Sequence, residues 1–292
     1  MANGNPCEHV FTVGSAQALA CWLLREIQIE SPMLEAQLLL GHVLKMDRIG
    51  VSLARKVPVS GEQARHFWSL IKRRLACEPM AYILGYKEFF GLTLLVNQDC
   101  LIPRPDTEVV VEKCLSLLPD QEGVVVFDIC TGSGAIAHAL LTSLKNVRVV
   151  GSDICPKALA IAQKNAENLG VDARFTALEG DLFTCFFGHE KASLIVANPP
   201  YISTGAMQDL ARDILDYEPQ KALHAGDEHG ISFYARILNQ AGAHLEPGGY
   251  LVFEIGFDQK EKIKSLVGSD WYVVEFFEDL AGNTRGVVLQ KT

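Results

Sequence analysis

The chain has 292 residues, of which 49% are hydrophobic and 21% are charged, and its formal net charge is −9. Such a composition is ordinary for a soluble globular protein, and the length leaves room for a second, smaller domain. The acidic balance argues against a protein whose main task is to grip a nucleic-acid backbone, and no apolar stretch is long enough to span a bilayer.

The first part of the chain is predicted to be a small helical bundle, which we assign as a domain at residues 1–85. Ser15 is expected to cap one helix, and Ser31-Pro32 to open another, because serine suits the N-cap and proline the first helical position. Ser60 and Gln63 make a capping box before a further amphipathic helix. This domain has nine Lys or Arg against seven Asp or Glu, a balance of +2 that leaves −11 for the remainder. The positive excess fits either an acidic partner or an ordinary solvated surface.

The hydrophobic period then changes. Apolar runs on both sides of Gly91 predict a β-hairpin, which we assign as a linker at residues 86–101. The segment Pro103-Arg104-Pro105 stops this element, and capping residues after it start a new helix. Residues 102–292 are assigned to one catalytic domain.

From residue 124 onward, strands and helices alternate, which predicts a doubly wound α/β sheet with parallel crossovers. The last two strands follow each other through a short loop and should form an antiparallel hairpin at one edge. Strands are expected at residues 124–129, 147–151, 173–176, 194–197, 250–255, 271–277 and 286–290, and helices at residues 109–117, 135–144, 156–169, 230–245 and 259–267.

A glycine-rich loop follows the first of these strands. In Cys130-Thr131-Gly132-Ser133-Gly134, the glycines let the backbone approach a ligand, and the helix that starts there offers free N–H groups. Asp153 ends the next strand, where a carboxylate can accept hydrogen bonds from ribose hydroxyls. Alone, this pattern is close to a nicotinamide dinucleotide fingerprint, so an oxidoreductase is a serious alternative.

The loop Asn198-Pro199-Pro200-Tyr201 separates these two interpretations. Its prolines cannot continue a strand ladder, so the loop carbonyls and the Asn198 side chain remain as acceptors at a strand's carboxyl end. A planar –NH2 group could give its two hydrogens to these acceptors while Tyr201 covers its face. For the tetrapeptide alone, a Pro-rich turn with a capping Asn is the favoured interpretation. Together with the glycine loop, however, the tetrapeptide favours a methyltransferase that uses S-adenosylmethionine, whose ribose suits Asp153 and whose adenine could contact Asp181-Leu182.

Longer segments resemble the release-factor glutamine N5-methyltransferases, which methylate the Gln of the Gly-Gly-Gln loop of class 1 peptide-chain release factors. The similarity covers nearly the whole chain, and residues 81–92 and 101–108 carry its most specific motifs. Residues 216–219 and 279–283 resemble later signatures of the family. The resemblance implies a Rossmann-like class I methyltransferase sheet with an antiparallel C-terminal hairpin. It also implies that the N-terminal helical bundle binds the release factor.

Three positions depart from the family's usual pattern. Cys130 stands where a Gly is usual, which slightly alters the first turn of the loop. Asp106 replaces a more common Glu and keeps a carboxylate, and Leu182 stands where an aromatic residue is common at the adenine. None of these changes touches the nucleophile site.

The resemblance further implies residue roles. Asn198 and the Pro199 carbonyl would accept the two hydrogens of the glutamine amide, and Pro200 and Tyr201 complete this catalytic and substrate-binding loop, in which Tyr201 packs beside the amide or is simply core. The implied cofactor-binding residues are Cys130, Thr131, Gly132, Ser133, Gly134, Asp153, Asp181, Leu182 and Asn198. The sulfonium needs no metal, and no obligatory strong base is expected.

Three further side chains have two interpretations each. Arg104 either lines the substrate entrance or pairs with Glu108. Glu254 lies inside a strand, so a structural hydrogen bond is favoured over catalysis. His138 is expected to be a packed or exposed helix residue rather than a base.

Two other classes of function remain open. A nucleic-acid amino methyltransferase acting on adenine N6 or guanine N2 shares the Asn-Pro-Pro-Tyr loop, but it should bring a basic groove, which a charge of −11 over residues 86–292 does not suggest. A non-catalytic nucleotide-binding interaction protein would leave that loop without a role. The expected partners are therefore class 1 release factors, with no direct nucleic acid and no membrane, and the chain is expected to act as a monomer that releases S-adenosylhomocysteine.

The eight cysteines are scattered, and they form neither a Cys-x-x-Cys pair nor a His/Cys cluster with zinc-ligand spacing. We therefore expect reduced thiols and a cytoplasmic protein. The early apolar run at residues 18–24 is not preceded by Lys or Arg, so it lacks the basic start of a signal peptide.

Overall fold

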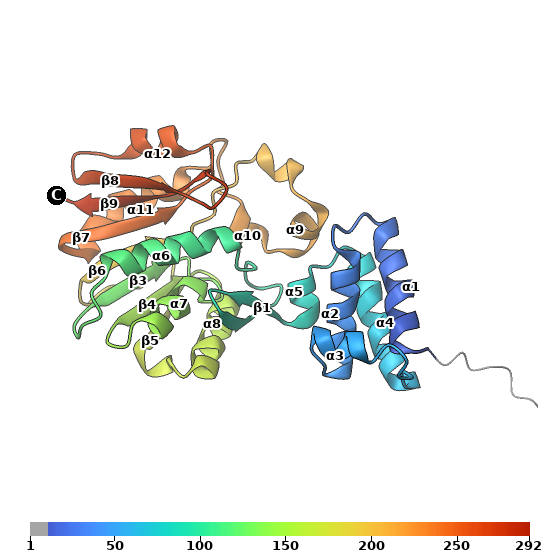
Figure 1. The fold of residues 1–292 in the computed structure, drawn as a ribbon. Helices are drawn as coiled ribbons and strands as arrows, with labels where there is room; N and C mark the ends of the chain where they lie inside the picture. The colour runs from blue at the N-terminus through green and yellow to red at the C-terminus, as the bar shows by residue number, and fades with distance from the viewer. Residues whose placement is uncertain (1–10) are drawn as a thin grey trace, which may run out of the picture. The chain divides into compact units, whose positions relative to one another are not determined.

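The computed structural model describes residues 11–292, so the first ten residues of the predicted N-terminal domain lie outside the described range. The chain separates into two compact units, which meet in sequence between Leu84 and Gly85 (Figure 1). None of the helices within residues 11–292 is both long and apolar enough to cross a membrane. Each unit is described by itself below.

The first unit is helical. Its helices are α1 (Val13–Glu26), α2 (Pro32–Leu44), α3 (Arg48–Leu53), α4 (Gly61–Leu75) and α5 (Met80–Leu84). They bury a common core that includes Leu24, Leu39 and Phe67, each with no exposed surface. Removal of such apolar side chains from water stabilises the bundle by about 1.5–3 kcal/mol each.

In this unit, the predicted N-terminal cap of one helix is confirmed and that of another is wrong. Ser60 and Gln63 form the predicted capping box at the start of α4. The cap of α1 is Thr12 rather than Ser15. Ser15 is the third helical residue, and its hydroxyl accepts from the Thr12 N–H at 2.9 Å while Thr12 Oγ1 accepts from the Ser15 N–H at 3.2 Å. The prediction missed this because a Thr with a Ser three residues later also forms a capping box.

The second unit contains a seven-stranded sheet in the order β5-β4-β3-β6-β7-β9-β8 (Figure 1). Strands β3 to β7 are parallel, and β9 is antiparallel to both of its neighbours. The predicted doubly wound sheet with an antiparallel C-terminal hairpin is therefore confirmed. The strands are β3 (Val125–Ile129), β4 (Arg148–Asp153), β5 (Phe175–Glu179), β6 (Ala192–Ala197), β7 (Leu245–Glu254), β8 (Trp271–Glu278) and β9 (Thr284–Lys291).

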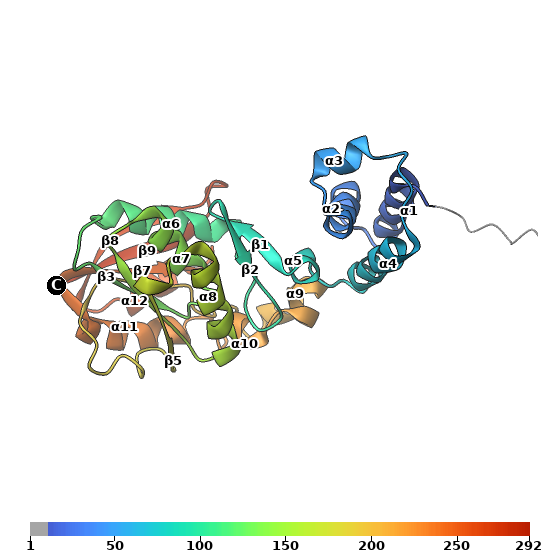
Figure 2. The same ribbon diagram turned by 90° about the horizontal axis from the view of Figure 1, so that it is seen from below.

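Helices cover both faces of this sheet (Figure 2). One face packs on α6 (Glu108–Leu117), α7 (Ala135–Ser143) and α8 (Pro156–Leu169), and the other on α11 (Ser232–His244) and α12 (Lys260–Leu266). Successive residues of β3 alternate between the two cores: Val126 belongs to the first, and Val125 and Phe127 to the second. Because both faces of β3 are buried, its sequence is apolar throughout except for Asp128.

A small hairpin precedes the sheet. Its strands β1 (Tyr86–Phe89) and β2 (Leu92–Leu95) are joined by Phe90 and Gly91, which both have positive φ, as a tight primed turn requires. Phe89 and Leu94 are buried in the same core as α6 and α7. The segment assigned from sequence as a linker thus folds as part of the second unit.

The periodicity of the sequence did not predict the short helices that follow β6. They are η3 (Ala206–Asp209), α9 (Arg212–Tyr217) and α10 (Gln220–Leu223). Elsewhere, η1 (Pro105–Thr107) precedes α6. The short helix η2 (Asp172–Arg174) precedes β5, which therefore starts at Phe175 rather than at residue 173 as predicted.

Candidate active site

The glycine-rich loop leaves the carboxyl end of β3 and turns into α7. Cys130, Gly132 and Gly134 all have positive φ, at 62°, 57° and 80°. A Cβ at Gly134 would lie 2.2 Å from Nε2 of the buried His138, so only glycine fits there, whereas a Cβ at Gly132 would point into open space. Cys130 therefore takes a left-handed conformation that glycine adopts more easily, and the departure from the family's Gly falls on a demanding position.

Asp128 holds this loop from inside the sheet. Its side chain is buried, and Oδ2 accepts hydrogen bonds from the Thr131 hydroxyl at 2.6 Å and from the Ala137 N–H at 3.2 Å. Burial raises the pKa of Asp128 to about 7, and Oδ1 has no hydrogen-bond partner. The sequence analysis did not select this residue, although a single acid inside the apolar strand β3 was a visible signal.

Asp153 lies at the carboxyl end of β4, where the sequence placed it. Its Oδ2 accepts from the Gly132 N–H and its Oδ1 from the Cys155 N–H, both at 2.9 Å. Burial raises its pKa, and these backbone hydrogen bonds lower it in part. The carboxylate is thus fixed directly against the glycine loop, with acceptor capacity left on both oxygens.

Asp181 and Leu182 follow β5, the next strand along. Asp181 pairs with Arg236 at 2.5 Å, and the Leu182 side chain is buried in the core, with a positive φ of 53°. The predicted cofactor residues other than Asn198 therefore follow the carboxyl ends of the three adjacent strands β3, β4 and β5. The adenine contact of Leu182 stays a prediction, because its side chain packs inward.

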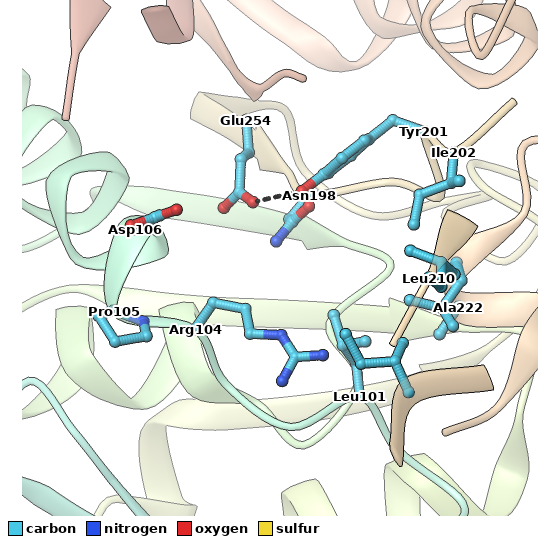
Figure 3. A pocket seen from close by; sticks show the side chains of 12 residues that line it. Leu101, Arg104, Pro105, Asp106, Asn198, Tyr201, Ile202, Leu210, Ala222 and Glu254 are labelled. Carbon is cyan, nitrogen blue, oxygen red and sulfur yellow. Dashed lines mark hydrogen bonds between the residues drawn. The ribbon is translucent and has the colours of Figure 1, made fainter. Parts of the chain in front are cut away.

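The Asn-Pro-Pro-Tyr loop follows β6. Pro199 and Pro200 are buried, Asn198 is half-buried, and the Asn198 Nδ2 donates to Thr107 Oγ1 at 3.5 Å. The hydroxyl of Tyr201 donates to Glu254 Oε1 at 3.5 Å (Figure 3). Burial raises the pKa of Tyr201, so it is a neutral donor at this site.

A cavity of about 290 Å³ opens beside this loop. The side chains of Asn198, Arg104 and Glu254 converge on it from different elements (Figure 3). The residues that line it are Leu101, Arg104, Pro105, Asp106, Asn198, Tyr201, Ile202, Leu210, Ile214, Ala222, Leu223 and Glu254. The structure thus brings Asn198, Tyr201 and Arg104 together, whereas the glycine loop, Asp153 and Asp181 lie outside this lining.

Arg104 lines the cavity, and its ion-pair partner is Glu218 rather than Glu108. Glu218 is buried and also accepts from the Ile102 N–H at 3.1 Å. Glu108 instead accepts from the Phe90 N–H at 2.9 Å, which fixes the hairpin. The proposed pairing with Glu108 is wrong because a residue 114 positions away in sequence competes for the guanidinium.

Glu254 and His138 are both buried. Burial raises the pKa of Glu254 to about 7, and it lowers that of His138 to about 4. The neutral His138 ring donates from Nε2 to the Ala162 carbonyl at 2.9 Å, as a packed helix residue. Glu254 has the structural hydrogen bond expected of it, but it also lines the cavity, which the sequence did not indicate.

An ion-pair network from the last hairpin reaches Asp106, one of the residues that line the cavity. Arg285 on β9 pairs with Asp106 and with Asp279, each at 2.9 Å. Within residues 11–292, no group of three or more His, Cys, Asp and Glu side chains is arranged to hold a metal ion. The polar groups around the cavity form hydrogen bonds and ion pairs with one another.

Comparisons with known proteins show which families the two parts of this chain resemble. A family described as the PrmC N-terminal domain matches residues 15–85, and a methyltransferase domain family matches residues 120–270. A release factor glutamine methyltransferase from Geobacter sulfurreducens is 42% identical over 243 residues, which cover 83% of this chain and 84% of that protein. The enzyme of the same name from Clostridium acetobutylicum is 35% identical and covers 91% of this chain and 94% of its own length.

Among solved structures, a methyltransferase from Pyrococcus furiosus matches with a TM-score of 0.52 and 19% identity. The match covers 80% of this chain and 98% of that one. At this identity the likeness concerns the fold alone.

Proposed function

This chain belongs to the family of release factor glutamine methyltransferases, and from that membership we propose that it methylates the N5 amide nitrogen of the glutamine in the Gly-Gly-Gln motif of class 1 release factors. The observation that carries the proposal is the cavity beside Asn198 and Tyr201, which combines a planar-amide acceptor with an aromatic wall. The methyl donor of the proposal is S-adenosylmethionine.

The residues after β3 and β4 fit this cofactor. The open space in front of Gly132 would admit a ligand close to the backbone, and a Cβ would fill it. Asp153 accepts from the N–H groups of Gly132 and Cys155 and keeps acceptor capacity for ribose hydroxyls. When bound, S-adenosylmethionine supplies an electrophilic methyl group on a sulfonium, which is lost to a nucleophile by in-line displacement.

The chain's own residues would solve the problem of a poor nucleophile. The lone pair of a glutamine amide nitrogen is delocalised into its carbonyl, so binding must orient that nitrogen. Asn198 Oδ1 and the Pro199 carbonyl would accept its two hydrogens, and Tyr201 would pack against the amide. Orientation alone supplies several kcal/mol of barrier lowering, and acceptors aimed at the positive charge that develops on nitrogen add to it. The methylated nitrogen then loses its proton to water or to an acceptor of the loop.

The helical unit would serve as the docking domain for the release factor in this proposal. It contains residues 15–84 of the match to the PrmC N-terminal domain, which ends at residue 85, and the positive excess of the chain. Electrostatic attraction at such a surface raises the rate of encounter more than it raises affinity.

The experiment that tests the function incubates the protein with S-adenosylmethionine and a purified class 1 release factor, and then maps added mass on its peptides. We expect one methyl group on the Gly-Gly-Gln glutamine. Asn198→Ala should lower kcat by a factor on the order of 10² or more while cofactor affinity is largely kept, because a lost acceptor misplaces the nitrogen. Asn168→Ala, on the exposed face of α8, is the matched control.

Two outcomes would contradict the proposal. Wild-type turnover in Asn198→Ala would remove this loop from the mechanism. Transfer of the methyl group to RNA or DNA, with none to a release factor, would instead identify a nucleic-acid amino methyltransferase.

A further inference from the structure

The cavity beside the nucleophile loop has two chemically different sides. Figure 3 shows the carboxylates of Asp106 and Glu254 on one side, and the side chains of Ile202, Leu210 and Ala222 on the other. The second side is built from one stretch of chain, between β6 and α11. We name it the apolar wall, and its residues are Ile202, Leu210, Ile214, Ala222 and Leu223.

The stretch of chain that forms the apolar wall is closed at its base. The Ile202 N–H donates to the Leu223 carbonyl, and the Ala225 N–H donates to the Ile202 carbonyl, both at 2.9 Å. Between these ends, the buried Glu218 pairs with Arg104, which also lines the cavity. These contacts connect the wall to the rest of the cavity, so it is a preformed surface rather than one that a ligand must first order.

The side chains of the apolar wall have surface left for a ligand. Ile202, Leu210, Ile214 and Ala222 are all half-buried. Among the residues that the structure describes, the two cores that pack against the sheet contain none of these four. Because removal of apolar surface from water is favourable in proportion to its area, an apolar group should occupy this side of the cavity in preference to a polar one.

The position of the wall favours the protein substrate over the methyl donor as its ligand. Gly132 and Asp153, which the proposed function assigns to the methyl donor, follow β3 and β4 and lie outside the cavity lining. The wall instead continues directly from the nucleophile loop, since Ile202 is the residue after Tyr201. A group that lies on the wall is therefore a neighbour of the glutamine that the nucleophile loop would hold.

The sequence of the substrate motif restricts where that neighbour can come from. The two residues before the glutamine in Gly-Gly-Gln are glycines, which have no side chain to offer. An apolar side chain at the wall must therefore belong to a residue that follows the glutamine. Three residues of extended chain span about 10 Å, which is enough to cross a cavity of about 290 Å³.

We propose that the apolar wall is a subsite for an apolar side chain among the three residues that follow the glutamine in the release-factor loop. The proposal rests on the proposed function and adds a determinant of substrate specificity to it. Binding at the wall holds the loop on one side of Asn198, so part of the binding energy serves to orient the glutamine amide. Ile214 of α9 and Ala222 of α10 are then specificity-determining residues.

The substrate part of the test uses an intact class 1 release factor and the full-length enzyme. In a reference substrate, the three residues after the glutamine are all alanine, and each of three derivatives has leucine at one of these positions. We expect one derivative to have a kcat/KM about 10-fold or more above that of the reference, because a hydrophobic pocket discriminates by this much for a missing methylene group. The other two derivatives should resemble the reference.

Three enzyme variants then locate the preference, which is measured as the ratio of kcat/KM between the best derivative and the reference. A loss of folded enzyme affects both substrates equally and cancels in this ratio. Ile214→Ala removes apolar surface from the wall and should lower the ratio several-fold, and Ala222→Leu fills the space and should abolish the preference. Leu215→Ala is the matched control, because Leu215 lies on the same helix without lining the cavity, and it should keep the wild-type ratio.

The outcomes separate the subsite from the proposed function. Equal kcat/KM for the reference and all three derivatives, or a wild-type ratio in both Ile214→Ala and Ala222→Leu, would overturn the subsite. An equal loss of the ratio in Leu215→Ala would also overturn it, because the fold of α9 rather than contact with the wall would then matter. Weaker S-adenosylmethionine binding in Ala222→Leu with an unchanged ratio would assign the wall to the cofactor instead.

In each of these cases the native release factor is still methylated, and the proposed function stands. A wild-type protein that methylates no release factor overturns the proposed function, and this inference with it.

Discussion

Asp128 and Glu254 share a property that links single residues to stability: burial raises the pKa of each to about 7. A carboxyl group with a raised folded-state pKa contributes stability that is fully present below its unfolded pKa. That contribution is lost as the pH rises through the folded pKa, because the buried group must then ionise. These two residues should therefore make the protein more stable at pH 5 than at pH 8, relative to variants without them.

Asp128→Asn tests this sign. The Asn oxygen can still accept from Thr131 and Ala137, but the side chain no longer ionises. The unfolding free energy of the variant relative to wild type should rise by about 2–3 kcal/mol between pH 5 and pH 8. Urea unfolding at both values measures the difference. An equal difference at the two pH values would mean that Asp128 titrates normally in the folded protein.

For single residues, the sequence predicted the loop residues of the candidate site better than the residues that hold these loops in place. The positions of Gly132, Gly134, Asp153 and Asn198 could be read from local motifs, because each follows the end of a predicted strand. Thr107 could not be assigned, since it meets Asn198 across 91 positions of sequence and only the folded sheet brings them together. The same reason hid the partnership of Arg104 with Glu218.

The ion pair of Arg104 with Glu218 connects whole elements, because it joins the segment before η1 to the segment between α9 and α10. Glu218 accepts from Arg104 and from the Ile102 N–H, and its side chain is 1% exposed. These contacts hold the cavity wall contributed by α9 and α10, neither of which has the length to be stable by itself.

Glu218→Gln should therefore loosen this wall. Loss of the charge leaves Arg104 poorly paired, so stability should fall by about 1.5–3 kcal/mol and the KM for the release factor should rise. The exposed pair of Arg212 and Asp216 on α9 supplies the control, since Arg212→Ala should cost at most about 1 kcal/mol. Thermal unfolding and steady-state kinetics measure both effects, and equal losses in the two variants would refute a special role for Glu218.

The sequence also predicted the ends of helices and strands where local residues set them, and it missed those that depend on contacts distant in sequence. Helix α8 begins and ends where predicted, because Pro156 opens it and Gly170 caps it in a left-handed conformation. Strand β7 begins at Leu245, five residues before its predicted start at Tyr250, because it keeps pairing with β6 through a register shift. Helices α9 and α10 carry no strong periodicity and depend on tertiary contacts such as those of Glu218.

For the whole molecule, the separation into two units has a direct test. A fragment of residues 85–292 retains the sheet, the hairpin and the cavity, since Asn165 of α8 binds both Leu95 of the hairpin and Ser133 of the glycine loop. We expect this fragment to fold and to bind S-adenosylmethionine as the full chain does. Its kcat/KM for an intact release factor should fall about 10-fold or more, because the second contact surface is gone.

A short peptide that contains Gly-Gly-Gln is the matched substrate for this experiment. The fragment and the full chain should methylate it equally, because the peptide has no surface for the helical unit. Full activity of the fragment on the intact release factor would show that the helical unit does not dock it.

The position of β9 between β7 and β8 has a consequence for synthesis on the ribosome. Strand β8 leaves the exit tunnel first, yet within the sheet it pairs with β9 alone, so it has no place to attach until β9 has also emerged. Until then β7 is an open edge, and Arg285 has not yet reached Asp106 at the cavity. A nascent chain therefore completes its sheet only late in translation, and partly made chains expose an unpaired strand that chaperones would have to protect.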